Sequence, residues 1–192
     1  MMQTNYLKLY IGPMFSGKTS NLLTEICKYR DVYNVLVVNH VLDKQRHPDS
    51  NFENIKTHDN ESYPAIMVET LFELKNNILY NQADVVIIDE AQFFTDLYEF
   101  LSMELNNFSK VKTFIVAGLS SDYKMSPIGD IIRLIPLCDE IYKLTSSCTV
   151  CNQPASFTKK NHNNHNNNQI QVGNSELFYP VCRLHHRLHH IN

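Results

Sequence analysis

The run GPMFSGKTS, from Gly12 to Ser20, has the residue types needed to hold a nucleotide phosphate. It fits the pattern G-x-x-x-x-G-K-[ST], in which two glycines allow a tight backbone path whose N–H groups point at an anion. Lys18 is expected to reach the terminal phosphates, and the Thr19 hydroxyl is expected to bind the magnesium ion that bridges them. The run therefore predicts a site for magnesium-ATP. Its other expected contacts are Gly12, Pro13, Met14, Phe15, Ser16, Gly17 and Ser20.

Two adjacent carboxylates, Asp89 and Glu90, follow the apolar run 85–88. If that run is a buried strand, both side chains lie at its end, where the second half of a nucleotide site is expected. Asp89 is the expected partner of the magnesium ion. Glu90 is the predicted general base, because a carboxylate there can accept the proton of an attacking hydroxyl or water, a role worth about 10²- to 10⁴-fold in rate.

Metal-ligand residues with zinc spacing occur near the end of the sequence, as Cys148-x-x-Cys151 and Cys182-x-x-His185. Together they complete a tetrahedral site with no position left for a substrate, so the zinc is expected to be structural. His186 is an alternative fourth ligand, although the spacing from Cys182 favours His185.

The composition narrows the class of protein. The 192 residues are 43% hydrophobic, enough for a full core, and the formal net charge is -3. A chain with a net negative charge is not expected to bind nucleic acid mainly through electrostatics, because contacts with nucleic-acid phosphates need clustered Lys and Arg side chains. No run approaches the roughly 20 apolar residues of a membrane span, and no signal peptide is evident. We expect a soluble cytoplasmic protein without nucleic-acid or membrane partners, in which Cys27 and Cys138 are small core residues.

Short Val- and Ile-rich runs alternate with helical periodicity, which is typical of an α/β fold with a mostly parallel sheet. The predicted strands, expected to be buried on both faces, are 6–11, 35–38, 85–88, 113–117 and 141–144.

Three helices are predicted between these strands. The first follows the run Gly12–Thr19, which we call the phosphate loop. The second is expected to open with a capping box at Thr70 and Glu73 and to continue as one amphipathic helix through Leu79. The third is expected to open in the same way at Asp96 and Glu99.

The helical pattern ends near residue 145, and cysteines, histidines and turn residues follow. We expect a P-loop NTPase-like α/β domain at residues 1–145, flanked by helices, and a small zinc-binding lobe at residues 146–192. The Asn- and His-rich run 161–168 is expected to be a solvated loop at a hairpin tip.

In this order, the motifs resemble those of type II thymidine kinases of animal cytosol, bacteria and large DNA viruses. The likeness rests on GPMFSGKT, on the strand end 89–94, on the run 144–151 and on the closing half-site 181–183, and it covers nearly the whole chain. It implies transfer of the γ-phosphate of ATP to the 5′-hydroxyl of thymidine, and of deoxyuridine, in nucleotide salvage. It also implies a homotetramer with a structural zinc in each subunit.

The resemblance further implies residue roles. It makes Glu90 the base on the 5′-hydroxyl and places Arg46 at a phosphate contact, although the spacing from Asp43 is one residue longer than in the family. It implies a thymine pocket closed by a loop that the zinc holds down. Tyr123 stands where the family commonly has Phe, and Phe178 where it usually has Tyr. The residues assigned to this pocket are Met14, Phe93, Tyr123, Gly173, Asn174, Ser175 and Phe178.

A nucleic-acid-binding P-loop ATPase, in which a zinc ribbon contacts DNA or RNA, is an alternative from another class. Its ribbon should be strongly basic and its chain should carry further motor motifs. This chain is short, and its zinc lobe has only a modest basic flank, made of Lys159, Lys160, Arg183 and Arg187. The pattern therefore favours the nucleoside kinase.

Overall fold

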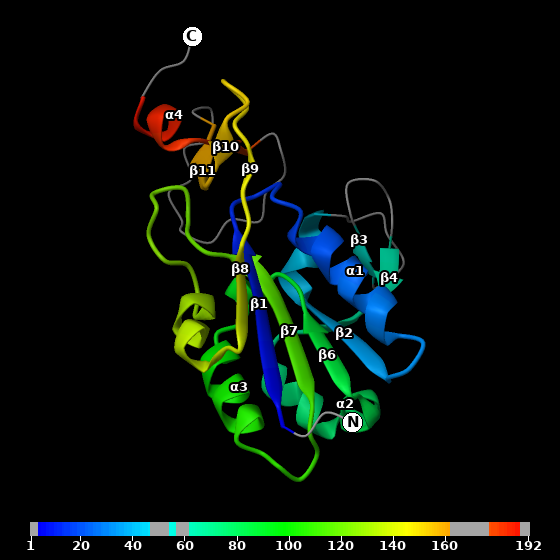
Figure 1. Ribbon diagram of the computed structural model, residues 1–192. Helices are drawn as coiled ribbons and strands as arrows, with labels where there is room; N and C mark the ends of the chain where they lie inside the picture. The colour runs from blue at the N-terminus through cyan, green and yellow to red at the C-terminus, as the bar shows by residue number, and fades with distance from the viewer. Residues whose placement is uncertain (1–3, 47–53, 57–61, 162–176, 189–192) are drawn as a thin grey trace.

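The computed structural model describes residues 4–46, 54–56, 62–161 and 177–188 (Figure 1). Six parallel strands form its central sheet, in the order β5-β2-β6-β7-β1-β8. In that order their bounds are Ile66–Val68, Val35–His40, Val85–Ile88, Thr113–Leu119, Tyr6–Gly12 and Glu140–Lys143. All five strands predicted for the sheet are present, and the parallel α/β fold is confirmed.

Helices and short strand pairs surround this sheet. The α-helices are α1 (Lys18–Tyr29), α2 (Ile78–Gln82), α3 (Leu97–Leu105) and α4 (Arg183–Arg187). The 3-10 helices are η1 (Val41–Arg46), η2 (Leu71–Asn76), η3 (Ala91–Phe93) and η4 (Ile131–Leu137). The antiparallel pairs are β3 (Asn54–Lys56) with β4 (Ser62–Pro64), β9 (Ser146–Ser147) with β10 (Pro154–Ala155), and β11 (Phe157–Lys160) with β12 (Phe178–Val181).

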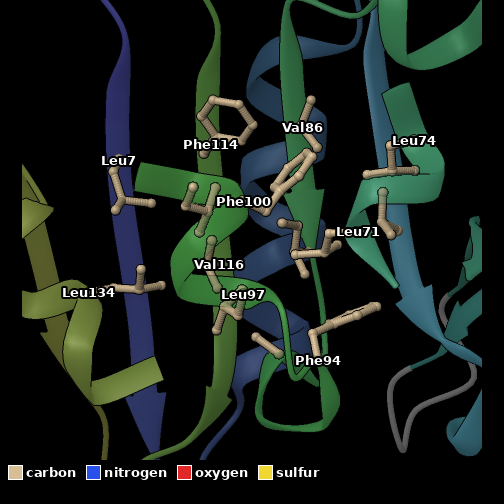
Figure 2. Packing of buried hydrophobic residues seen from close by; sticks show 14 of the residues in the cluster. Leu7, Leu71, Leu74, Val86, Phe94, Leu97, Phe100, Phe114, Val116 and Leu134 are labelled. Atoms are coloured by element: carbon tan, nitrogen blue, oxygen red, sulfur yellow. The ribbon is translucent and has the colours of Figure 1, made fainter. Parts of the chain in front are cut away.

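The core consists of two layers, because alternate residues of each strand point to opposite faces of the sheet. On one face, Val116 of β7 packs in a cluster with Leu97 and Phe100 of α3 (Figure 2). On the other face, Ile115 of β7 packs in a second cluster with Leu22 of α1. Both faces of the central strands are therefore buried, as their continuous apolar runs predict.

The carboxyl ends of the strands all point towards one end of the molecule, where β9, β10, β11 and α4 lie (Figure 1). The phosphate loop follows β1 at this end, and the pair Asp89 and Glu90 follows β6. In a parallel α/β sheet this is the edge where ligands bind. The fold thus gathers at one edge the segments to which the sequence assigns chemistry.

The prediction of one amphipathic helix from Thr70 to Leu79 is wrong. The capping box does form, with the Thr70 N–H donating to Glu73 Oε1 at 2.8 Å, but it opens the 3-10 helix η2. Asn77 then adopts an extended backbone, and its side chain accepts the Leu79 N–H at 2.8 Å, so it caps the separate helix α2. This break leaves Leu79 51% exposed.

The third predicted helix is present as α3, but its predicted capping box is not formed. Asp96 Oδ2 accepts the N–H of Phe72 at 3.0 Å instead, and it makes no side-chain bond to its own helix. The carboxylate therefore ties α3 to η2, a contact between elements that local spacing does not reveal.

Some residues predicted to be buried are exposed or only half-buried. Cys27, expected in the core, is exposed on α1, because Ile26 beside it takes the inward position. Cys138 is half-buried against the core. Strand β8 lies at the edge of the sheet, so its Ile141 and Tyr142 are exposed rather than covered on both faces.

Among the described residues, no helix combines the length and the apolar character that crossing a lipid bilayer would require.

Replacement of Phe100 by Ala is expected to lower the free energy of unfolding by about 3–5 kcal/mol, because the ring is fully buried between α3 and the sheet and its loss leaves a cavity. Urea unfolding followed by circular dichroism measures this. The matched control is Phe108→Ala, since the Phe108 ring is 71% exposed, and its effect should stay below about 0.5 kcal/mol. Equal losses in the two variants would contradict the assigned core.

Candidate nucleotide and metal site

The phosphate loop begins where β1 ends and leads directly into α1. Gly17 caps this helix with φ 77° and ψ 24°, a left-handed backbone that glycine adopts without steric cost. The turn places the first turn of α1 next to the loop, where the helix dipole favours an anion. The predicted anion cradle therefore has the local geometry that its sequence requires.

Bonds within the loop hold its cationic side chain. Lys18 Nζ donates to the carbonyl oxygen of Pro13 at 2.7 Å, and Ser16 Oγ donates to the same oxygen at 2.9 Å. The ammonium group thus lies over the loop, where a bound phosphate would compete with the carbonyl for it.

Thr19 and Asp89 meet although they lie 70 residues apart. Thr19 Oγ1 donates to Asp89 Oδ2 at 2.9 Å, and Asp89 Oδ1 accepts the N–H of Glu90 at 2.8 Å. Burial of Asp89, together with the negative charge of Glu90, raises the pKa of the Asp89 carboxyl well above its ordinary value. A hydroxyl and a carboxylate are oxygen ligands of the kind that magnesium prefers, so these residues fit that ion, whose charge would favour the ionised carboxylate.

Glu90 stands at the end of β6 in a left-handed conformation, with φ 50° and ψ 38°. Such a backbone is uncommon for a residue other than glycine and persists where surrounding contacts hold it. Asp89 Oδ1, which accepts the Glu90 N–H, supplies a contact to this backbone, while Gln92 holds the side chain, because its Nε2 donates to Glu90 Oε2. Gln92 Oε1 in turn accepts the N–H of Leu119 at 2.9 Å, and the side chain is 1% exposed.

Gln92 has no role predicted from the sequence, although it stands in the strand end 89–94. Its position two residues after Glu90 could have indicated a role. Where a strand turns directly into a helix, side chains two residues apart can come into contact. The structure makes it a buried link between Glu90 and the end of β7.

Four metal-ligand side chains converge in the zinc lobe: Cys148, Cys151, Cys182 and His185, whose ligand atoms all lie within 4.8 Å of one another. A tetrahedral zinc with zinc–sulfur bonds of about 2.3 Å places its ligand atoms about 3.6–3.8 Å apart. The sulfurs of Cys151 and Cys182 lie 3.8 Å apart and Cys148 Sγ lies 3.5 Å from His185 Nδ1, both close to this spacing, whereas Cys182 Sγ and His185 Nδ1 are closer, at 3.2 Å. The four residues therefore fit the predicted structural zinc.

At Cys148, the local hydrogen bonds favour the thiolate that zinc needs. Burial of Cys148 opposes its ionisation, but hydrogen bonds from backbone N–H groups outweigh this and lower the pKa of the thiol. His186, the alternative ligand, points elsewhere, because its Nε2 lies 3.0 Å from the carbonyl oxygen of Tyr123. The geometry selects His185 as the fourth ligand.

Of the residues predicted for the thymine pocket, the structure brings Tyr123 and Phe178 together. The rings of Tyr123 and Phe178 lie 6.3 Å apart between centroids. The backbone N–H of Met14 donates to Thr158 Oγ1 at 3.1 Å, and Phe93 is buried against His40.

Several predicted site residues cannot be placed. Gly173, Asn174 and Ser175 lie outside the described residues, as do the side chain of Arg46 and most of the run 161–168. Strands β11 and β12 flank that run and pair antiparallel. This pairing is compatible with the prediction that the run lies at a hairpin tip.

Comparisons with known proteins extend these observations. A family model described as "Thymidine kinase" matches residues 5–186 of the chain. A thymidine kinase of Yaba monkey tumor virus is 36% identical over 184 residues, 95% of this chain and 94% of the viral protein. One of Amsacta moorei entomopoxvirus is 38% identical over 93% of this chain and 96% of its own. "Thymidine kinase a" of Arabidopsis thaliana is 36% identical over 94% of this chain and 74% of the plant protein.

Among solved structures, a match is found with Bacteroides Pif1 bound to single-stranded DNA. This match has a TM-score of 0.31 and 14% identity, over 75% of this chain and 39% of that chain.

Zinc analysis tests the metal cluster. The purified protein is expected to bind about one zinc per chain, and Cys182→Ser should abolish this and lower the melting temperature, because three ligands hold zinc far less tightly than four. Atomic emission spectroscopy gives the zinc content. Cys27→Ser is the matched control, since this exposed thiol lies outside the cluster. Full zinc retention in Cys182→Ser would refute the ligand set.

Proposed function

The chain belongs to the thymidine kinase family, and on that premise we propose how its own residues transfer the γ-phosphate of ATP to the 5′-hydroxyl of thymidine. It is an enzyme that phosphorylates thymidine, with a nucleoside and ATP as substrates. The proposal concerns which side chains bind the phosphates, which one moves the proton and which ones select the base.

The observation that carries the proposal is the contact between Thr19 and Asp89. It joins the phosphate loop to the end of β6, so one site offers N–H groups, the Lys18 ammonium and two magnesium-type oxygen ligands. We propose that the loop binds the β- and γ-phosphates and that Lys18 leaves the Pro13 carbonyl to bind them. A magnesium ion held by Thr19 and Asp89 would neutralise charge that develops on the phosphates.

Glu90 is the proposed general base. Its carboxylate takes the proton of the 5′-hydroxyl while the hydroxyl oxygen attacks the γ-phosphorus, the bond from that phosphorus to the bridging oxygen breaks, and ADP leaves. Gln92 holds the Glu90 carboxylate through a side-chain hydrogen bond. Since Gln92 is itself fixed to the Leu119 N–H, it limits the orientations open to the base.

The thymine pocket is proposed to lie between the phosphate loop and the zinc lobe. The supporting contacts are the ring pair of Tyr123 and Phe178 and the bond from Met14 to Thr158 of β11. An apolar notch accepts the thymine methyl group, and deoxyuridine, which lacks only that methyl, should also bind. Phe93 and residues 173–175 complete the proposed pocket, and Arg46 is proposed to contact phosphate.

Organisation and assembly are proposals as well. Residue 145 lies between β8, the last strand of the central sheet, and β9, the first strand of the zinc lobe, which supports a division into 1–145 and 146–192. From the family resemblance we propose a cytoplasmic homotetramer that does not act on nucleic acid.

The basic side chains of the zinc lobe support the kinase over the nucleic-acid-binding alternative. Lys159 Nζ donates to the carbonyl oxygens of His185 and Leu188, and the Arg183 guanidinium lies 4.7 Å from the centroid of the Phe157 ring. These cations are engaged in contacts that hold α4 against β11, so they serve the folding of the lobe.

Replacement of Glu90 by Gln is expected to lower kcat about 10²- to 10⁴-fold, because the amide keeps the shape of the side chain but cannot accept the proton. Coupled detection of ADP with thymidine as the acceptor measures turnover, and calorimetry of a non-hydrolysable ATP analogue should show affinity within about threefold of the unsubstituted protein.

The matched control is Glu99→Gln on α3, because the Glu99 carboxylate is 55% exposed and pairs with Arg133 at 3.8 Å. Its turnover should equal that of the unsubstituted protein. Undiminished turnover in Glu90→Gln would exclude Glu90 as the base.

A further inference from the structure

The segment that connects β8 to the zinc lobe runs alongside the phosphate loop. The Leu144 N–H donates to the carbonyl oxygen of Ile11 at 2.7 Å, which extends the pairing of β8 with β1. At Gly12 an added Cβ would lie 2.8 Å from both the Leu144 carbonyl oxygen and Ser16 Oγ, closer than real Cβ atoms approach. The first residue of the loop is therefore packed directly against the chain that leads into the lobe.

Two hydroxyls of the zinc lobe bind the backbone of the loop at adjacent residues. Ser146 Oγ donates to the carbonyl oxygen of Phe15 at 2.9 Å, and Thr158 Oγ1 accepts the N–H of Met14 at 3.1 Å. Ser146 belongs to β9 and Thr158 to β11, and Thr158 is 4% exposed. One donor and one acceptor of the lobe thus hold the backbone of Met14 and Phe15 on either side of the peptide bond that joins them.

The residue so held is in an unusual conformation. Phe15 has φ 61°, in the left-handed region that a bulky side chain rarely enters. Such a residue stays there only where neighbouring contacts determine its backbone. Ser146 supplies a contact of this kind from outside the loop.

Both hydroxyls lie close to the metal-ligand residues. Ser146 is two residues before Cys148, and Thr158 pairs with Pro180, two residues before Cys182. Cys148 and Val181 also share the small apolar core of the lobe. The position of the two hydroxyls therefore follows from the same packing that brings the metal ligands together.

We propose that Ser146 and Thr158 are positioning residues for ATP: they hold the turn at Met14 and Phe15 in the shape that the phosphates require. This rests on the proposed function of the phosphate loop, and it gives the zinc lobe a second role besides contact with the nucleoside. In this arrangement the lobe prepares the loop before ATP arrives, so the free energy of ordering the turn does not reduce ATP affinity.

Ser146→Ala tests the proposal, because it removes the hydroxyl and leaves the strand position intact. Titration calorimetry with magnesium and adenylyl imidodiphosphate should show a dissociation constant about fivefold higher, as expected for loss of one hydrogen bond to a neutral acceptor. The KM for ATP should rise in parallel, by more than kcat falls. Thymidine affinity, measured by calorimetry without nucleotide, should change by less than about twofold.

Two further variants separate positioning from general stability. Ser147→Ala is the matched control, because Ser147 is the exposed neighbour in the same short strand, and its ATP affinity should equal that of the unsubstituted protein. Ser146→Thr keeps a hydroxyl and should restore ATP affinity to within about twofold. A loss of ATP affinity in Ser146→Ala that Ser146→Thr does not restore would overturn the proposal.

Thr158→Val tests the second anchor, since it has a similar shape but cannot accept the Met14 N–H, and Thr158→Ser keeps the hydroxyl. If both hydroxyls hold one turn, the double variant Ser146→Ala, Thr158→Val should weaken ATP binding by a factor that differs from the product of the single effects. Independent effects of the two substitutions on ATP affinity would overturn the shared role. Thymidine affinity is compared for Ser146→Ala alone, because the bond from Met14 to Thr158 also supports the proposed thymine pocket.

The experiments distinguish failure of the positioning role from failure of the proposed function. If the unsubstituted protein binds adenylyl imidodiphosphate but Ser146→Ala binds it equally well, the positioning role is wrong while the kinase mechanism stands. If the unsubstituted protein forms no thymidine monophosphate, the proposed mechanism fails whatever the binding of the variants.

Discussion

The hydrogen bond from Thr19 to Asp89 is the contact on which the candidate site depends, because it joins two segments that only the sheet brings together. Strand β7 lies between β1 and β6, so the loops that follow these two strands meet across it at their carboxyl ends. Asp89 is buried there beside Glu90, an arrangement that disfavours two negative charges. Two neighbouring carboxylates, one of them buried, are suited to binding a cation and the phosphates that the cation accompanies.

Around this contact, polar side chains reach across elements to fix the backbone of the loops. Gln92 joins Glu90 to the end of β7, and the lobe hydroxyls of Ser146 and Thr158 join the phosphate loop to β9 and β11. Two residues with left-handed backbones, Phe15 and Glu90, lie within these networks. Two uncommon backbone conformations at the candidate site thus lie among partly buried hydrogen bonds, and such contacts can order a loop before its ligand binds.

The zinc lobe belongs to this arrangement. Its own apolar core is small, built around Cys148, Ala155 and Val181, and a bound zinc would supply much of the free energy that orders it. Its position at the carboxyl ends of the strands is secured by contacts with the main domain, among them the one between His186 and the Tyr123 carbonyl. The lobe thus contacts both the phosphate loop, through Ser146 and Thr158, and the segment that carries Tyr123, through His186.

Elements with a local signal could be predicted from the amino-acid sequence alone. Five strands of the parallel sheet, the phosphate loop and the four metal ligands follow from apolar runs, glycine positions and cysteine spacing, since each depends on neighbours within a few residues. Local sequence patterns did not predict the correct hydrogen bond where a side chain had two possible partners. Thr70 capped a 3-10 helix that Asn77 ended, and Asp96 turned to Phe72 instead of its own helix.

The meeting of groups that are distant in sequence depends instead on the folded chain. The exposure of Cys27 and the contacts of Gln92, Ser146 and Thr158 follow from how the strands and the lobe pack. Hydrogen-bonding side chains reach only about 3 Å, so residues far apart in sequence can select their partners only after the fold has brought them within that distance.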